Sequence, residues 1–227
     1  MLDLKLPTHR RGFLGSVAAT AAALGLGDLV PGSLQAEEYA RQAGGDPTYA
    51  AWLAGIKGTQ RQVYDAVAPN DGFALIWAHV FLLTGVPAYG VRESDLGVVV
   101  VLRHSAIPLA FNDAMWAKYK FGEVFKVTDK STNAPAERNV FAHLKPGDMP
   151  LPDAALEKLV ARGVRFGVCN MAITVFGGMV AQKMGLQAEA VKQDWIANRL
   201  SGITVVPSGV VAVNGAQSKG CSYCYAG

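Results

Sequence analysis

The chain has 227 residues, of which 51% are hydrophobic and 17% charged, and its formal net charge is only +3. A charge this small, with no cluster of lysine and arginine, argues against nucleic acid or an anionic membrane as a partner. Three cysteines are too few for a disulfide scaffold, and one of them must stay unpaired within the chain, so we expect chemical rather than structural roles for them.

The N-terminus has the pattern of a twin-arginine signal peptide. Arg10 and Arg11 precede Phe13 and Leu14, and an apolar run rich in Ala and Gly follows. We predict a signal peptide over residues 1–36 and a periplasmic location. The apolar run is shorter than the about 20 residues that a membrane-spanning helix needs, so no permanent membrane anchor is expected. The alternative is an ordinary amphipathic helix.

A lead-in helical segment is predicted over residues 37–60, packed on the outside of one domain that spans residues 61–227. Tyr49 and Trp52 follow a helical rhythm in this segment. Residues 61–67 then alternate polar and apolar side chains, which predicts a first strand.

The next elements alternate between buried helix and buried strand. Residues 73–83 are almost wholly apolar, and the helix that they predict is expected to end at Gly85 and Pro87. Residues 96–102 form a continuous β-branched run, which is typical of a strand covered on both faces.

The middle of the chain combines regular and irregular segments. A helix is predicted over residues 107–119 and an irregular excursion over residues 123–150, which contain three prolines. Asp153 is expected to cap a further helix that runs to Arg162. Residues 163–169 predict a second buried strand.

The C-terminal part continues the alternation. It predicts helices over residues 170–184, 195–200 and 208–218, and strands over residues 186–191 and 221–225. This order predicts a three-layer α/β/α domain, in which a doubly wound, mostly parallel sheet of about five strands lies between helices.

Cys169 is the main candidate for chemistry. It ends a predicted strand and directly precedes a helix that Asn170 is expected to cap, at the edge of the sheet where ligands bind in such folds. A helix N-terminus offers a positive dipole and unpaired N–H groups, which favour the thiolate. The alternative is a buried, inert cysteine, and a functional thiol should be partly exposed.

The chain contains four further segments of note, over residues 98–104, 107–110, 163–169 and 206–217, together with Gly220 and Tyr223. In their order and spacing these segments resemble the DsrE/DsrF-like (sulfur-relay) family, in particular its exported single-domain members. The resemblance implies the three-layer fold, frequent homo-oligomers, and protein partners that donate or accept sulfur. It also implies that Cys169 matches the position at which relay members carry a cysteine persulfide.

Cys221 and Cys224 form a C-x-x-C pair, which can be a resolving or redox dithiol, part of a soft-metal site, or a disulfide. Residues three apart on a strand face opposite sides of a sheet, so the pair converges only if the backbone turns near Cys221. If the last strand is parallel to its neighbours, Cys224 ends near the edge that holds Cys169, and three thiols could share one corner.

Three further residues are candidates for the cleft at this edge. His104 follows the strand over residues 96–102, Asp71 follows the first strand, and Asn170 follows Cys169. The alternative for His104 is a structural, hydrogen-bonded histidine. His79 lies in an apolar helix and is expected in the core, and His143 is expected to be solvated.

Three functions remain open at this stage. The leading hypothesis is a periplasmic sulfur-handling protein, possessing sulfur-transferase-like chemistry, in which Cys169 carries sulfane sulfur and Cys221 and Cys224 reset it. The second is a module that holds Cu(I) or Zn(II) through the three cysteines and His104. The third is an interaction protein without chemistry. The sequence has no phosphate-binding loop, serine nucleophile elbow or H-E-x-x-H pattern.

Overall fold

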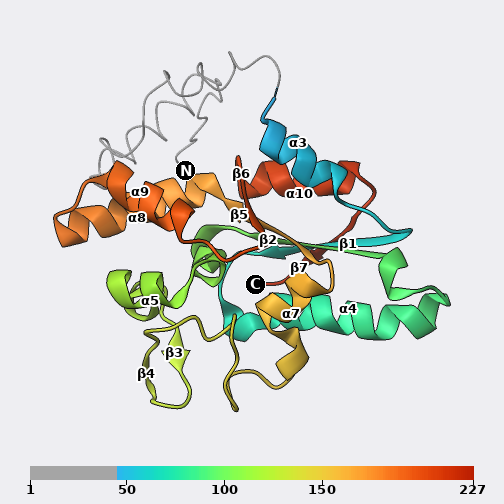
Figure 1. Ribbon diagram of the computed structural model, residues 1–227, viewed down its shortest axis with the longest axis horizontal. Helices are drawn as coiled ribbons and strands as arrows, with labels where there is room; N and C mark the ends of the chain where they lie inside the picture. The colour runs from blue at the N-terminus through green and yellow to red at the C-terminus, as the bar shows by residue number, and fades with distance from the viewer. Residues whose placement is uncertain (1–44) are drawn as a thin grey trace, which may run out of the picture. The chain divides into compact units, whose positions relative to one another are not determined.

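The computed structural model of the protein describes the unit formed by residues 45–227. The predicted signal peptide over residues 1–36 and the first part of the lead-in segment lie outside the described residues. A five-stranded parallel sheet in the order β6-β5-β2-β1-β7 runs through the unit (Figure 1). Its strands are β1 (Gln60–Ala66), β2 (Leu96–Leu102), β5 (Arg165–Cys169), β6 (Ile203–Val206) and β7 (Ser222–Tyr225). The predicted α/β architecture is thereby confirmed.

Helices cover both faces of the sheet. One face carries α3 (Pro47–Ala54) and α10 (Gly209–Ser218), and the other carries α4 (Phe73–Tyr89) and α7 (Leu156–Ala161) (Figure 1). Parallel strands are joined by right-handed crossovers. The connecting helices therefore lie on one face of the sheet while the chain moves in one direction across it, and on the other face when the chain moves back. The chain moves from β1 to β2 through α4 and enters β5 after α7, and it later returns from β6 to β7 through α10, which accounts for the two layers.

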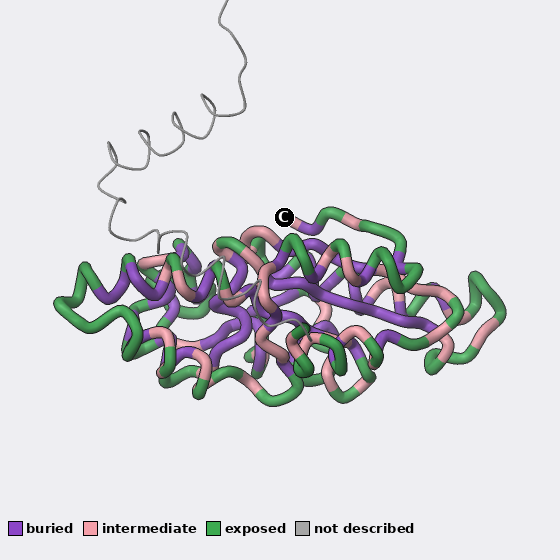
Figure 2. Tube along the Cα trace, turned by 90° about the horizontal axis from the view of Figure 1, so that it is seen from above, coloured by how far each residue is buried: buried purple, intermediate pink, exposed green. Residues whose placement is uncertain are grey.

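Alternate side chains of each strand enter two separate cores. Val63, Val99 and Val101 pack towards α3 and α10, whereas Tyr64 and Val100 pack towards α4. The strand β2 is buried along its whole length, as its β-branched run predicts. Figure 2 shows the buried trace running through the centre of the unit with exposed segments outside it.

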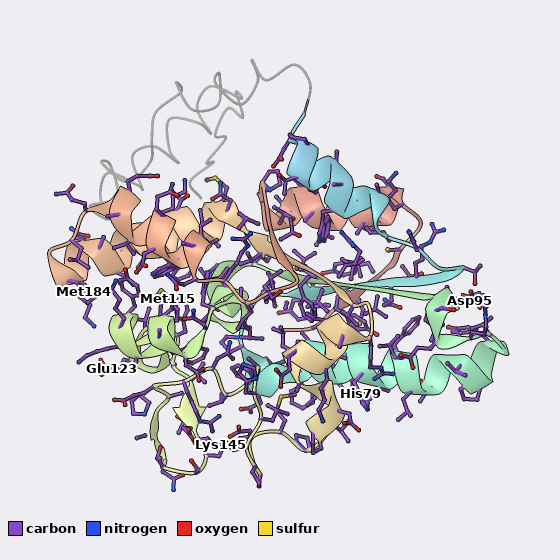
Figure 3. All side chains as sticks on the ribbon, in the orientation of Figure 1. His79, Asp95, Met115, Glu123, Lys145 and Met184 are labelled. Carbon is purple, nitrogen blue, oxygen red and sulfur yellow. The ribbon has the colours of Figure 1, made fainter. Side chains whose placement is uncertain are left out.

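A third group of helices lies beyond the carboxyl edge of the sheet. It comprises the 3-10 helix η3 (His104–Ala110) and the helices α5 (Asp113–Tyr119), α8 (Asn170–Met184) and α9 (Ala188–Ala197). Figure 3 shows Met115 of α5 and Met184 of α8 on this side and Asp95, which precedes β2, on the opposite side. The strand ends therefore open towards α8 and η3.

The remaining elements are short. The excursion predicted over residues 123–150 is mostly irregular and contains one hairpin, whose two antiparallel strands have two residues each. The short elements are η1 (Asn70–Gly72), η2 (Glu93–Asp95), α6 (Phe121–Val124), β3 (Thr128–Asp129), β4 (Ala134–Pro135) and η4 (Pro152–Ala154).

The expectation that the lead-in helix packs outside the domain is wrong. Trp52 of α3 is buried, and its Nε1–H donates to the carbonyl oxygen of Phe166 in β5 over 3.0 Å. The missing side chain of Gly167 leaves room for this ring against the sheet. The helix α3 is therefore an integral part of one layer.

The strand predicted over residues 186–191 is also wrong, because residues 188–191 are the first residues of α9. Val191 and Trp195, four residues apart, are its buried residues, which is the spacing of one helix face. The edge strand is instead β6, a four-residue β-branched run between Gly202 and Pro207.

The helix α4 does not end at Gly85 and Pro87 but continues to Tyr89. Gly90 then closes it in the left-handed conformation, with φ 64°. A proline in the last turn removes only one hydrogen bond of the helix, so the chain tolerates it there. Residues Asn70–Tyr89 are long and apolar enough to cross a bilayer, but α4 buries one face against β1 and β2.

Two predicted helix starts differ from the structure. The segment over residues 107–119 is not one helix, because an isolated bridge between Phe111 and Arg199 separates η3 from α5. Asp153 does not cap the following helix, because α7 begins after Ala155 and the Asp153 carboxylate instead pairs with Lys158 at 2.9 Å.

An ion cluster closes the irregular excursion. The guanidinium of Arg138 contacts Asp129 at 2.9 Å and Asp148 at 2.7 Å, and both carboxylates are buried. A hydrogen bond from Ser131 lowers the pKa of Asp129. Burial alone would raise the pKa of Asp148, but hydrogen bonds from Arg138 and from the Lys145 N–H outweigh it and lower that pKa.

We predict that Asp148→Asn lowers the free energy of unfolding at pH 7 by about 3 kcal/mol, because it leaves Arg138 half-buried with one partner fewer. The ionised Asp148 stabilises the fold above its unfolded pKa of about 3.9, and this contribution is lost as pH falls through the lower folded pKa. In urea unfolding experiments, the free energy of unfolding should therefore fall less between pH 7 and pH 3 in the variant than in the wild type. Glu137→Gln, an exposed charge change nearby, is the control; an equal loss there would contradict the prediction.

Candidate functional site

The carboxyl ends of the strands bring residues from four distant parts of the chain together. Asp65 lies near the end of β1, Arg103 directly follows β2, Cys169 ends β5, and Tyr223 lies in β7. Parallel strands end at the same edge of a sheet, so their terminal residues become neighbours there.

Cys169 itself is the N-cap of α8. The backbone N–H of Ala172 donates to its Sγ over 3.3 Å. The prediction that Asn170 caps the helix is therefore wrong, because Asn170 is the first residue of α8. It lines a different, polar cavity that also contains Lys192 and Arg199. The sulfur takes the place at the helix N-terminus that an oxygen of Ser or Asp usually occupies.

A cavity of about 410 Å³ reaches Cys169 between α8 and the start of α10. We call it the thiol pocket. The residues that define it are Arg103, His104, Cys169, Met171, Phe176 and Val210. Cys169 is only 6% exposed, which is less than the partial exposure expected for a reactive thiol. The residue therefore lies at the floor of the pocket, where only a ligand small enough to enter can contact it.

Arg103 is held beside Cys169 by a buried carboxylate. Its Nε and Nη2 donate to the two oxygens of Asp65 at 2.6 and 2.9 Å, and the Tyr223 hydroxyl donates to Oδ2 of Asp65 at 3.0 Å. The hydrogen bond to Asp65 raises the pKa of Arg103 most, and negative charge at Cys169 raises it further. The guanidinium thus stays charged and lies close enough to interact with charge on the sulfur.

Gly209 at the start of α10 permits this position of Arg103. A Cβ atom at Gly209 would overlap the Cβ and Cδ atoms of Arg103. Because the overlap includes the Arg103 Cβ next to the backbone, the side chain could not move aside without shifting the main chain. Ser208 caps α10 through its side chain, which accepts from the Val211 N–H.

His104 also lies at the pocket, as its position after β2 predicts. Its backbone is left-handed, with φ 49°. The ring meets Phe176 edge-on, with 5.5 Å between the ring centroids, and Nδ1 is 3.3 Å from the Ser105 hydroxyl. The two contacts orient the imidazole at the pocket wall.

Cys221 and Cys224 do not join Cys169. Cys221 packs in the core under α3 and α10, whereas Cys224 contacts the core on the other face. Cys224 is paired with Tyr64 of β1, so β1 and β2 separate it from β5, which is about 14 Å in the plane of the sheet. All three cysteines are free thiols.

The predicted corner of three thiols is thus not formed. Among residues 45–227, no group of three or more His, Cys, Asp and Glu side chains is placed to hold a metal ion. Cys169 and His104 are the two members of the predicted metal set that share the thiol pocket. Burial raises the pKa of both Cys221 and Cys224, which disfavours their thiolates.

Asp71 does not belong to the site either. It lies in an exposed turn with φ 50°, and its carboxylate is 4.0 Å from the Lys130 amine. The two other histidines lie away from the pocket. His79 is buried in α4 with Nδ1 2.9 Å from Arg162 (Figure 3), and the exposed His143 is 2.6 Å from Glu157.

The sequence interpretation missed Asp65, Arg103 and Tyr223. A signal for the first two was present: Asp65 is a carboxylate among apolar residues of a strand, and Arg103 follows a wholly apolar strand without an acidic neighbour. Asp65 and Arg103 pair because β1 and β2 are neighbours in the sheet, and the order of strands cannot be predicted from a local sequence pattern.

Comparison with known proteins does not identify a family. No family model matches the chain, and no curated protein matches it. The chain is similar in structure to a protein of unknown function from Methanobacterium thermoautotrophicum, with 16% sequence identity and a TM-score of 0.38 over 73% of this chain and 98% of that one. The DsrE/DsrF-like resemblance therefore stays a prediction from the sequence.

We predict that a small thiosulfonate, methyl methanethiosulfonate, modifies Cys169 before Cys221 in the native protein. Both residues are 6% exposed, so the comparison isolates the effects of the pocket and of the raised pKa of Cys221. Brief labelling at pH 7.5, acid quenching and peptide mass spectrometry give the order. Faster modification of Cys221 would show that the pocket does not admit the reagent to Cys169.

Proposed function

We propose that this protein is an exported, DsrE/DsrF-like sulfur-handling protein in which Cys169 receives sulfane sulfur as a persulfide and passes it to an acceptor. The observation that carries the proposal is the placement of the Cys169 sulfur at the floor of a pocket, where it accepts the Ala172 N–H at the N-terminus of α8 and has Arg103 beside it. The export pathway and the periplasmic location come from Arg10 and Arg11 and the apolar run behind them.

The chemistry requires a thiolate and a small sulfane donor. The Cys169 thiolate attacks a sulfane sulfur of an inorganic polysulfide; one S–S bond of the donor breaks, one Sγ–S bond forms, and the electron pair leaves with the shortened polysulfide. The proton of the thiol passes to solvent. The product is a Cys169 persulfide anion, and attack by an acceptor thiolate on its outer sulfur restores the Cys169 thiolate.

The surroundings of Cys169 stabilise negative charge on sulfur at each stage. The α8 dipole and the Ala172 N–H act on Sγ, and the Arg103 guanidinium acts through the pocket. Apolar walls limit water at the floor, which strengthens these interactions. Cys221 and Cys224 lie too far away to reset the persulfide, so release depends on an external acceptor rather than on the C-x-x-C pair.

We predict that the protein without its signal segment gains the mass of one or more sulfur atoms on Cys169 after incubation with inorganic polysulfide, and that dithiothreitol removes the gain. Cys169→Ser should abolish the gain, whereas Cys221→Ala and Cys224→Ser should retain it. Intact mass spectrometry followed by peptide mapping measures both. Sulfur uptake that persists in Cys169→Ser, or a folded wild-type protein that takes up none, would overturn the proposed function.

Arg103 provides a second test of the same site. We predict that Arg103→Met lowers the initial rate of sulfur uptake at pH 7 about tenfold, because a charge-assisted interaction is lost, and that Arg103→Lys recovers part of the rate. Gly209→Ala should act in the same direction because it displaces Arg103.

The controls for this test are Gly177→Ala, where a Cβ meets its neighbours at ordinary contact distance, and Arg92→Met, which removes an exposed ion pair at the opposite edge of the sheet. Both should keep the wild-type rate, with thermal unfolding as the check on folding. If Arg103→Met took up sulfur at the same initial rate as the control variants, Arg103 would have no part in the mechanism.

A further inference from the structure

The lining of the thiol pocket is mostly apolar. Met171 and Val210 stand at its mouth, and Met171 is 49% exposed. Phe176 forms a wall, with the edge of His104 against it. The one side chain with a fixed charge in the lining, Arg103, binds Asp65 through Nε and Nη2. A ligand in this pocket therefore meets mostly apolar and thioether surface, with Arg103, His104 and Ser208 as its polar lining.

A second cavity of similar size shows the contrast. It measures about 430 Å³, and Asp46, Lys192, Gln193 and Arg199 line it. A strongly hydrated anion such as thiosulfate would exchange water there for the cationic groups of Lys192 and Arg199 and the amide of Gln193. In the thiol pocket the same anion would lose its hydration mostly against apolar side chains, with Arg103 as the one fixed positive charge, which is less favourable.

From this lining we infer that the sulfur donor of Cys169 is an apolar sulfur chain or ring, with cyclo-octasulfur as the simplest example, rather than a hydrated sulfur oxyanion. The inference rests on the proposed function and names its substrate class. Sulfur rings have no charge and are highly polarisable, so they gain from burial against Met171, Phe176 and Val210. The pocket volume lies within the range of small-molecule sites.

The reaction needs no further oxidant or reductant. The Cys169 thiolate attacks one sulfur of the ring, one S–S bond of the ring breaks, and one Sγ–S bond forms. The electron pair of the broken bond stays on the far end of the opened chain, which becomes a terminal anion bound to the protein. The proton of the thiol goes to solvent, and all eight sulfur atoms remain on Cys169 until an acceptor shortens the chain.

The chain offers a matched pair of variants for the test. Met171 and Met179 both lie on α8 and are 49% and 47% exposed, but only Met171 lines the pocket. The initial rate of sulfur uptake at Cys169 is measured by mass spectrometry with finely dispersed cyclo-octasulfur and, separately, with thiosulfate. It is measured for the wild type, Met171→Gln and Met179→Gln.

We expect the wild type to take up sulfur faster from cyclo-octasulfur than from thiosulfate. In Met171→Gln the ratio of these two rates should fall about fourfold, because the loss of one buried methylene-sized contact changes a rate by about that factor. Met179→Gln should match the wild type, and iodoacetamide should label Cys169 equally in all three. Faster uptake from thiosulfate in the wild type, or equal effects of the two variants, would overturn the inference while leaving the proposed function intact. Absence of uptake from inorganic polysulfide as well would instead overturn the proposed function.

Discussion

The last crossover of the chain is the constraint on which the site depends. After β6, at one edge of the sheet, the chain must return across the other strands to pair β7 with β1 at the opposite edge. A right-handed connection in this direction has to run over the face that α4 and α7 leave open. The helix α10 therefore lies across β1, β2 and β5, and its first turn lies against Arg103. The same return places Tyr223 beside Asp65.

The Asp65–Arg103 pair shows how the lost hydration of a buried ion pair is compensated at the carboxyl edge of the sheet. A buried carboxylate loses several kcal/mol of hydration, and a single partner rarely compensates for it. Asp65 receives three hydrogen bonds from two side chains, and Arg103 reaches it from the neighbouring strand end. An apolar pair would fill the space at lower cost. A charged pair next to a helix-capping thiol instead provides a fixed field at the sulfur, which is the kind of arrangement that perturbs reactivity at functional sites.

The three cysteines show that burial alone does not describe a thiol. Cys169 and Cys221 have the same exposed fraction, yet their surroundings differ in kind. The Cys169 sulfur meets a backbone N–H, a helix N-terminus and a cavity, whereas Cys221 lies among apolar side chains that raise its pKa. Cys224, three residues further along, is turned to the other core. A pair that suggests joint chemistry in the sequence is thus divided by the sheet.

The sequence by itself determined the elements whose signals are local: the β-branched strand β2, the strand β5 ending at Cys169 before a helix, the helix α10 after Pro207, and the terminal strand β7. Each depends on the period and type of neighbouring side chains, which act over a few residues. Only the tertiary structure decided that residues 188–191 begin a helix, because Val191 and Trp195 are buried on one face there, and that Trp52 belongs to the core. It also decided that Asp65, Arg103 and Tyr223 meet and that Cys221 and Cys224 do not, because strand order and the face of a strand are set by long-range pairing, which local patterns do not contain.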